Sequence, residues 1–552
     1  AVVSGCDSIL DKGPLDSFTN DNFWTGEGNI SGYANAFYEQ FLGYGNGNGY
    51  GDFYFKTLSD DQAGMSFAKW TYPDNAPSTS ATWKNGWIEV RRANIMLENV
   101  PTVASLDEAT KNHWLGVARL MRAWQYYHLV RMYGNLPWID KALNINDEGE
   151  IYGNREDRDM VMDKVLEDLD FAVTNIKDIS SKTTWSRSLA NAMKAEVCLY
   201  EGTFRKYRKN EDGQQAPDAT GAARYLTACK EACLAVMSKG YKLNTSYQGN
   251  YNSTDLSSNP EMILYKAYKE GLLMHSTIDY TCSSTQISGM SKNAFESYLF
   301  KDGKPMALTS LNKSDEAPFQ YGHLSLKDIL AVRDKRLAQT IDTVLLYNGR
   351  GFTRFNTGME STSSTGYGVA KYDNETIPEG FRSQSGKNYT HAPLFWLSVI
   401  YLNYAEACAE LGNITQDDLD KSINLLKDRA GLPHLNPIVG FSDPANNHGV
   451  SDLIWEIRRE RRCELMFDND NRYWDLIRWH QLDKLDTTKY PDIILGANVA
   501  NDMDGCEANK VGKYIDGSKD GSRIYDKKHY LYPIPTGQIA LNPQLAPNNP
   551  GW

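Results

Sequence analysis

The stretch Val450–Trp479 decides the fold of this chain: VSDLIWEIRRERRCELMFDNDNRYWDLIRW. Apolar residues recur at helical spacing in its first half and predict a helix with one apolar stripe, made of Val450, Leu453, Ile454 and Ile457. One turn further, the same stripe meets Arg461 and Glu464, where core residues are due. Because an unpaired buried charge is very costly, the pattern predicts a mostly buried lattice of arginine and glutamate.

The spacing of charges within this helix supports the lattice. Four of them stand three or four positions apart, the separation at which helical side chains touch: Glu456, Arg459, Glu460 and Glu464. The polar run Asp468–Arg472 then ends the helix, and a second apolar face begins at Tyr473. Carboxylates beside arginines can also be catalytic, but ion-pair networks without a histidine or a nucleophile are more often structural. We therefore interpret the cluster as structural.

The composition is that of a large globular protein with a surplus of aromatic residues. The chain has 552 residues, 41% hydrophobic and 23% charged, so the size of the core is not limiting. Its 33 Tyr and 13 Trp have a flat apolar face and a polar edge, which suits sugar or peptide surfaces and also half-buried core positions. A net charge of −12 argues against a nucleic-acid binder, which needs a clustered basic face.

The first residues, AVVSGC, fit the end of a bacterial lipoprotein signal peptide, because V-S-G-C matches a lipobox. We expect residues 1–16 to be a lipobox remnant followed by a tether, with Cys6 carrying the lipid. The alternative is a chance run of small residues. No run of about 18 apolar residues occurs, so no membrane-spanning helix is predicted.

Motifs for catalysis or for a cofactor are not evident. Seven cysteines besides Cys6, with no C-x-x-C pair, predict buried thiols rather than disulfides or a zinc site. The histidines show no metal-ligand spacing, no G-x-S-x-G elbow occurs, and the glycines of Gly43–Asp52 do not fit a nucleotide-binding register. Asp502–Gly505 hints at a calcium loop but lacks the closing Glu. We expect no cofactor and no metal, although paired carboxylates of the glycosidase type cannot be read from a sequence.

Helical periodicity dominates two parts of the chain. The expected helices are Gly28–Phe41, Trp83–Val100, Leu106–Tyr133, Asp157–Ile176, Ser188–Lys206, Gly221–Ser238, Leu394–Leu411 and Asp417–Ala430. Leu106–Tyr133 is apolar on two sides, which predicts packing between neighbours, and Gly134 and Pro137 end it. Small residues at contact points predict tetratricopeptide-like hairpins, without a strict 34-residue period. Between Gly240 and Pro393 the helical period fails, except at 324–340.

Several of these segments resemble the SusD/RagB family, the surface nutrient-binding lipoproteins of Bacteroidetes-type glycan-uptake systems. The resemblance is carried by RRERRCELMFDNDNRYWDLIRW, by RLMRAWQYYHLVRMYGNLPWI in the longest helix, and by the terminal YLYPIPTGQIALNPQLAPNNPGW. It implies a mainly α fold, with a tetratricopeptide-like helical-hairpin scaffold and a large loop-rich, irregular subdomain. In these terms residues 17–552 form a single SusD-like domain. Its scaffold covers about 28–42, 83–238 and 394–486, its loop-rich ligand-binding part about 43–82 and 240–393, and its C-terminal loop block 487–552.

The resemblance also implies a function. We expect a non-enzymatic, cell-surface lipoprotein of the outer membrane that captures glycans by aromatic stacking and passes them to a SusC-like TonB-dependent transporter. Aromatic and polar residues of two loops are the candidate ligand-binding residues: Asp61, Trp70, Tyr72, Asn75, Tyr280, Gln286, Phe319 and Tyr321. They are chosen by loop position and residue type, since no exact motif identifies them.

Three alternatives stay open. An oligopeptide-binding protein of the same family would use Tyr and Trp equally well. A surface glycoside hydrolase would need two loop carboxylates that are essential for turnover. A helical-repeat scaffold that binds only proteins would expose a concave helical groove, and its loop aromatics would not matter.

Overall fold

The computed structural model describes residues 20–56, 58–64, 75–282, 288–311, 325–350, 352–353, 355, 360–468 and 470–552. The chain forms two compact units that are interleaved along the sequence. The first unit draws its described residues from the segment that ends at Phe41, from Ser78–Ile179 and from Pro535–Pro547. The second draws them from Leu42–Pro77, Ser180–Ile534 and Asn548–Trp552.

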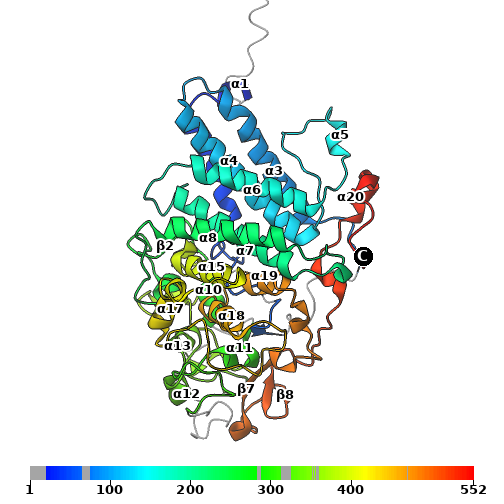
Figure 1. Cartoon of the computed structure of the whole chain (residues 1–552). Coiled ribbons are helices and arrows are strands. Elements are labelled where there is room, and N and C mark those ends of the chain that lie inside the picture. The colour runs from blue at the N-terminus through cyan, green and yellow to red at the C-terminus, as the bar shows by residue number, and fades with distance from the viewer. Residues whose placement is uncertain are drawn as a thin grey trace, which may run out of the picture. The chain divides into compact units, whose positions relative to one another are not determined.

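Three long helices build the first unit: α3 (Ala81–Asn99), α4 (Glu108–Tyr133) and α6 (Arg158–Asn175). α4 packs against both α3 and α6, as its two apolar sides predict (Figure 1). The shorter elements are α1 (Asn20–Phe23), α2 (Glu27–Asn35), η1 (Ala36–Gln40), η3 (Val100–Thr102), α5 (Glu148–Ile151), α20 (Thr536–Leu541) and η9 (Pro543–Leu545).

Capping residues set where these helices begin and end. The side chain of Ser80 accepts a hydrogen bond from the Trp83 amide, and that of Asp107 accepts one from the Thr110 amide. Gly134 ends α4 with a φ of 72°, a backbone conformation that glycine adopts without strain. The boundaries predicted from the sequence for α3 and α4 are therefore correct to within two residues.

Four longer helices form the scaffold of the second unit: α7 (Arg187–Tyr207), α8 (Ala219–Met237), α15 (Leu397–Glu410) and α18 (Asp452–Glu464). The shorter α19 (Asn471–Arg478) follows α18. α7 packs along α8, and α15 packs against α7, α8 and α18. The remaining helices are short: η4 (Asn210–Asp212), α9 (Gly249–Asn252), α10 (Thr277–Cys282), α11 (Lys292–Ser297), α12 (Lys327–Ala331), α13 (Lys335–Thr340), α14 (Glu379–Arg382), α16 (Gln416–Asp420), α17 (Ile423–Ala430), η5 (Leu482–Leu485), η6 (Pro491–Ile493), η7 (Ala500–Asp502) and η8 (Lys527–Tyr530).

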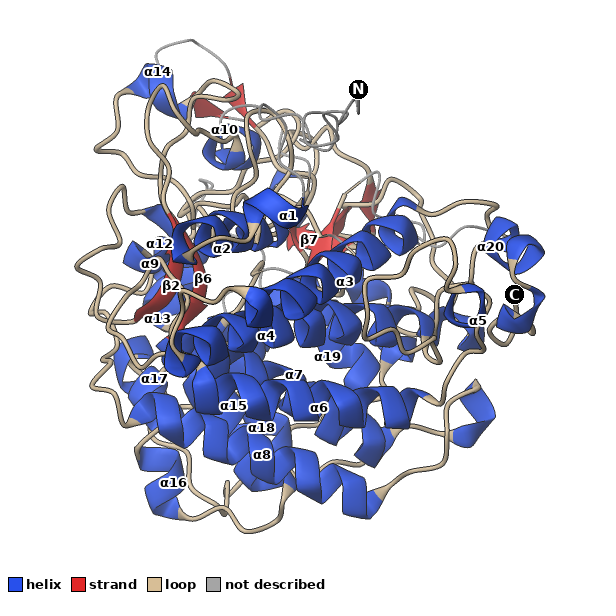
Figure 2. Cartoon of the chain, turned by 90° about the horizontal axis from the view of Figure 1, so that it is seen from above, coloured by secondary structure: helices blue, strands red, loops and turns tan. Residues whose placement is uncertain are grey.

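The strands of the described residues are few and short. β2 (Met262–Lys266) pairs antiparallel with β6 (Ala392–Trp396), and the two lie side by side in Figure 2. The others are β1 (Gln62–Ala63) with β3 (Gly289–Met290), β4 (Phe352–Thr353) with β5 (Glu360–Ser361), and β9 (Tyr514–Asp516) between β7 (Leu495–Asn498) and β8 (Lys510–Val511). The fold is thus mainly α with tetratricopeptide-like helical hairpins, as expected.

The lattice of buried charges on α18 is confirmed, with a different geometry from the one that its spacing suggests. Only Glu456 and Arg459 pair along the helix, at 2.9 Å. Glu460 and Glu464 instead accept hydrogen bonds from Arg336 of α13, at 2.5 and 2.7 Å. The lattice therefore ties elements together across long stretches of sequence, and charged residues replace apolar ones as the contact between helices.

Four details of the prediction are wrong. Asp417–Ala430 is not one helix, because a turn at Lys421 and Ser422 separates α16 from α17. Leu394–Trp396 belongs to β6 and not to the following helix, because those residues pair with β2. The region 240–393 contains short helices besides 324–340, namely α9, α10, α11 and α14. On α18, Leu453 and Ile454 are only half-buried, whereas the charged residues of the lattice are fully buried.

Two further findings concern the described residues as a set. The seven cysteines from Cys198 to Cys506 are all free and buried, as predicted. Among the residues that the structure describes, no helix combines the length and the apolar character needed to cross a bilayer.

Candidate ligand-binding site

The structure describes three of the eight predicted ligand-binding residues, Asp61, Asn75 and Tyr280. Asn75 is exposed. The predictions at Trp70, Tyr72, Gln286, Phe319 and Tyr321, and the predicted lipidation site Cys6, lie outside the described residues.

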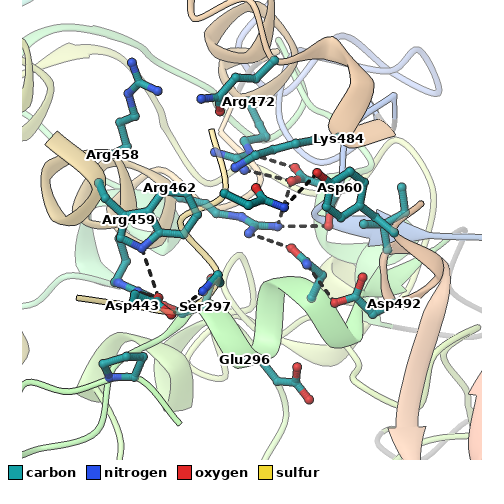
Figure 3. A pocket seen from close by; sticks show the side chains of 18 of the residues that line it. Asp60, Glu296, Ser297, Asp443, Arg458, Arg459, Arg462, Arg472, Lys484 and Asp492 are labelled. Atoms are coloured by element: carbon teal, nitrogen blue, oxygen red, sulfur yellow. Dashed lines mark hydrogen bonds and ion pairs between the residues drawn. The ribbon is translucent and has the colours of Figure 1, made fainter. Parts of the chain in front are cut away.

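Asp61 is buried and belongs to a tight group of charges. Its carboxylate accepts a hydrogen bond of 2.7 Å from Nε of Arg462 on α18. The neighbouring Asp60 accepts two hydrogen bonds from Arg472, at 2.7 and 2.8 Å, and its backbone oxygen accepts a third from Arg462. Figure 3 shows Arg462 and Arg472 converging on Asp60. The carboxylates of Asp60 and Asp61 are thus both hydrogen-bonded to arginines of the protein itself.

The pKa values of the two carboxyls show how differently the arginines act on them. Burial alone would raise the pKa of Asp60, but Arg462 and Arg472 outweigh burial and hold that pKa well below its usual range. For Asp61 burial raises the pKa, against the opposing effect of Arg462. The pair fastens the segment around β1 to α18, and direct contact of Asp61 with a ligand stays a prediction.

Tyr280 lies in a cluster of three aromatic rings at the surface. The rings of Tyr50 and Phe55 stack with their centroids 4.5 Å apart and an interplanar angle of 13°. Tyr280 meets both edge-on, at 5.6 Å from Tyr50 and 6.0 Å from Phe55. Tyr50 is 58% exposed, so much of its ring faces solvent. We call these three residues the aromatic platform.

The glycine-rich stretch Gly43–Asp52 presents Tyr50. A Cβ atom at Gly45 would lie 2.3 Å from the carbonyl oxygen of Gly49, and one at Gly51 would lie 2.1 Å from that of Gly43. Only glycine allows the chain to approach itself so closely there. The loop is also anchored, since Gly47 donates its amide to Met274 and accepts from the Ser276 hydroxyl, both at 2.8 Å. The glycine run is therefore a tightly folded loop.

Polar groups surround the aromatic platform. The Tyr280 hydroxyl donates to the backbone oxygen of the exposed Asn48, at 3.2 Å. The half-buried Asp279 accepts a hydrogen bond of 2.7 Å from the hydroxyl of the exposed Ser385. An aromatic face bordered by hydroxyl, amide and carboxylate groups can stack on one side of a sugar ring and bond its hydroxyls.

The sequence prediction names Tyr280 and not Tyr50 or Phe55, which the structure places against it. The signal for Tyr50 was a tyrosine within a glycine run. Phe55 had no such signal, because its role depends on stacking with Tyr50.

The acidic segment Asp502–Gly505 has a different use from the one that its composition suggested. Asp502 accepts hydrogen bonds from Tyr347 at 2.5 Å and from Arg350 at 2.8 and 3.0 Å. Within the described part of the chain, no group of three or more His, Cys, Asp or Glu residues is placed to hold a metal ion.

Comparison with known proteins connects this geometry to a family. The model of the SusD family matches residues 235–552, and a model described as starch-binding associating with outer membrane matches residues 20–199. SusD-like protein P38 of Formosa agariphila is 24% identical over 491 residues, which are 86% of this chain and 88% of that protein.

Solved structures show the same fold. A SusD-like carbohydrate-binding protein of Bacteroides fragilis superposes with a TM-score of 0.70 at 20% identity, covering 95% of this chain and 100% of that one. A laminarin-binding SusD-like protein superposes with a TM-score of 0.56 at 19% identity, covering 96% and 100%. With a family model matched over more than half of its length, the chain belongs to the SusD family.

Proposed function

We propose that this protein is a glycan-binding protein of the bacterial cell surface, and that the aromatic platform is part of its binding site. The observation that carries the proposal is the exposed ring of Tyr50, held in place by Phe55 below and by Tyr280 at its edge. Rings of this kind that are fixed before binding lose little entropy when a ligand stacks on them. The carbohydrate-binding and laminarin-binding relatives support the same ligand class.

The predicted loop residues complete the proposed site. In the sequence, Gln286 comes a few residues after the end of α10, the helix that carries Tyr280, and Trp70 and Tyr72 come after β1. In this proposal the aromatic residues stack on sugar rings and the polar ones, including Asn75, bond hydroxyls, with Phe319 and Tyr321 as further contacts. Asp61 acts through Arg462, by fastening the base of the first loop.

Binding without turnover is the proposed activity. The buried carboxylates of Asp60 and Asp61 are bonded to arginines, and the sequence has neither a G-x-S-x-G elbow nor an H-E-x-x-H pair. A surface glycoside hydrolase is the alternative in the enzyme class, and it would release new reducing ends from a bound glycan.

Attachment to the outer membrane completes the proposal. The family model described as starch-binding associating with outer membrane supports that location. We infer lipid attachment at Cys6 and delivery of the glycan to a SusC-like TonB-dependent transporter. Replacing Cys6 by Ser in the producing bacterium should move the protein from the membrane fraction to the soluble fraction.

Affinity electrophoresis tests the binding function. The protein from about residue 20 onward is run through gels that each contain one polysaccharide, and its mobility is compared with that in a gel without glycan. One glycan should retard the protein. The Tyr50→Ala variant should bind it about tenfold more weakly, since losing a central aromatic contact costs more than about 1 kcal/mol. The Trp70→Ala variant tests the predicted loop in the same gels.

The Tyr152→Ala variant is a matched control, because Tyr152 is a similarly exposed tyrosine (46%) outside the platform. It should bind like the unaltered protein. New reducing ends in the gel would favour the hydrolase. Retardation by no glycan, together with binding of oligopeptides in calorimetry, would favour the oligopeptide-binding alternative, and binding of neither would leave a role limited to protein partners.

A further inference from the structure

The second unit contains a cavity of about 400 Å³ that shares no residue with the aromatic platform. Its size is in the range of small-ligand pockets in proteins, which hold about 300–1,000 Å³. α18 and the segment from α19 to η6 form much of its wall. Five cationic side chains line it: Arg458, Arg459, Arg462, Arg472 and Lys484.

Three of these cations, Arg459, Arg462 and Arg472, form ion pairs with carboxylates of the protein itself. Arg459 is paired with Glu456 and Asp443. Arg462 and Arg472 are held by the carboxylates around Asp60, and Arg462 also donates to the Asn293 side chain at 2.8 Å. Their positive charge is largely balanced before any ligand arrives.

Lys484 is different. It is partly buried, and to the described residues its ammonium group makes no hydrogen bond and no ion pair. The ammonium group lies over the face of Trp455, 4.6 Å from the ring centroid. Figure 3 shows its side chain beside Arg472 and Asp60. Burial lowers the pKa of Lys484 to about 7; Arg472, Arg462 and Arg458 add to this effect and Asp60 opposes it. A negatively charged group in the cavity would offset both the cost of burying the ammonium group and its repulsion by the three arginines.

Arg458 also has unused hydrogen-bonding capacity. It is 4% exposed, and its one ion pair among the described residues, with Glu410, is long at 3.4 Å. Its Nε and Nη1 atoms are buried without a hydrogen-bond acceptor in the described structure. A buried donor that lacks an acceptor costs about 1–3 kcal/mol, so such groups are rare in folded proteins.

The rest of the wall suits a sugar ring. Trp455 is half-buried and lines the cavity with part of its indole ring. The ring of Trp479 is covered by Arg458 and Arg478, which lie 4.4 and 4.6 Å from its centroid. The side chain of Gln481 makes no hydrogen bond to the described residues, and the Tyr490 hydroxyl accepts a hydrogen bond from Asn447 at 3.1 Å and adds a polar edge. An aromatic ring, an amide and an unpaired ammonium group are together the contacts of a carboxylated sugar.

We propose that this cavity is a second ligand site, which binds a hexuronate by pairing its carboxylate with Lys484 while its ring packs against Trp455. The anionic character of the ligand follows from the unpaired Lys484, because the carboxylates that also line the cavity are bonded within the protein: Asp60 to Arg472, Asp443 to Arg459, Glu296 to Lys292 and Asp492 to Asn293. The choice of a sugar acid rests on the proposed glycan-binding function. No bond is made or broken.

Titration calorimetry of the whole protein tests the proposal. Glucuronate and galacturonate are the probes, glucose is the neutral equivalent, and sulfate is the plain oxyanion. A hexuronate should bind at about pH 7.5 with uptake of protons, detected as a dependence of the heat on the ionisation enthalpy of the buffer, because the bound anion raises the pKa of Lys484. Glucose should not bind.

The Lys484→Met variant should bind the hexuronate at least about tenfold more weakly. Lys489→Met is the matched control, since Lys489 is an exposed lysine nearby that does not line the cavity, and it should bind normally. Equal binding of glucose and hexuronate, binding of sulfate alone, or no binding of either hexuronate would overturn the proposal. The proton uptake is measured on the unaltered protein, so it decides the matter even if Lys484→Met does not fold. Loss of glycan retardation in Tyr50→Ala would leave this result unchanged, which separates the two sites.

Discussion

Glu406 of α15 is a buried carboxylate for which the effects of burial and pairing can be compared. It accepts hydrogen bonds from Arg478 at 2.7 and 2.8 Å and from the Trp479 indole at 2.6 Å. Burial alone would raise its pKa, but Arg478 outweighs burial and lowers the pKa to about 2 from its ordinary value of 4.5. The folded protein therefore holds Glu406 ionised where the unfolded chain would protonate it.

This shift predicts an acid-dependent part of the stability. Since the folded-state pKa is depressed, the contribution of Glu406 is fully present above about pH 4.5 and is lost as the pH falls toward 2. The Glu406→Gln variant should lower the free energy of unfolding by about 3 kcal/mol near neutral pH, because it removes the main partner of a buried arginine. Urea unfolding at a series of pH values measures both effects, and the difference between variant and unaltered protein should shrink below about pH 4.

Glu375→Gln is the control, because Glu375 is exposed in the same unit. Its free energy of unfolding should stay within about 0.5 kcal/mol of that of the unaltered protein at every pH. A difference for Glu406→Gln that did not change with pH would contradict the assigned pKa.

At the scale of elements, close helix packing depends on small residues. A Cβ atom at Gly202 of α7 would lie 2.7 Å from Cγ of Leu226 and 3.1 Å from its backbone nitrogen on α8. Gly202→Ala should therefore destabilise the protein by about 1–3 kcal/mol, despite the better helix propensity of alanine. Gly32→Ala of α2 should stabilise it by up to about 1 kcal/mol, since nothing lies within 4 Å of the added atom.

Urea unfolding measures the free energy of unfolding of both variants, which should fall for Gly202→Ala and rise for Gly32→Ala. If Gly202→Ala were as stable as Gly32→Ala, the close approach of α7 and α8 would not depend on the missing side chain. The result would then show that Leu226 moves aside at little cost.

The elements also show what a sequence can predict. Helices such as α3 and α4 could be placed because their signals are local: a capping serine or aspartate, a periodic apolar face and a terminal glycine. β6 could not be placed, because Leu394–Trp396 has a helix-compatible sequence and its pairing with β2 joins residues far apart in the chain. The partners of the lattice were unpredictable for the same reason, since Arg336 lies more than 120 residues from Glu460.

The residues of the candidate site also differ in whether the sequence alone could indicate them. Tyr280 was chosen by residue type and loop position, and its contact with a ligand stays a prediction. Tyr50 and Phe55 could not be chosen in this way, because their stacked geometry exists only once the glycine run has folded. Lys484 carries no local signal at all, since its unusual position depends on arginines from two helices.

At the scale of the whole molecule, the C-terminal segment serves both units in turn. Gly537 donates to the backbone oxygen of Ser78 at 3.1 Å, and Asn542 donates to that of Gly153 at 2.9 Å, all within the first unit. The last residues belong to the second unit, where the Trp552 indole donates to the backbone oxygen of Leu531 at 2.8 Å.

Two C-terminal truncations should therefore lower amide-exchange protection in different units. A chain that ends at Pro547 should lose amide-exchange protection in the second unit alone, because it lacks the contacts of Asn549 and Trp552. A chain that ends at Ile534 should lose protection in both units. Hydrogen exchange followed by mass spectrometry distinguishes the two patterns, and equal loss in both units after removal of residues 548–552 would contradict this division.

The interleaving of the units has a consequence for biosynthesis. The chain passes from one unit to the other after Phe41, Pro77, Ile179, Ile534 and Pro547. Because a ribosome adds about 5–20 residues per second, α3, α4 and α6 emerge tens of seconds before the segment that completes their unit. Until Leu545 has been synthesised, the site in the first unit that buries its side chain is unfilled. Each nascent chain thus exposes an incomplete helical unit to which a chaperone can bind. Cutting the chain at any single peptide bond also cannot give two fragments that each contain a whole unit.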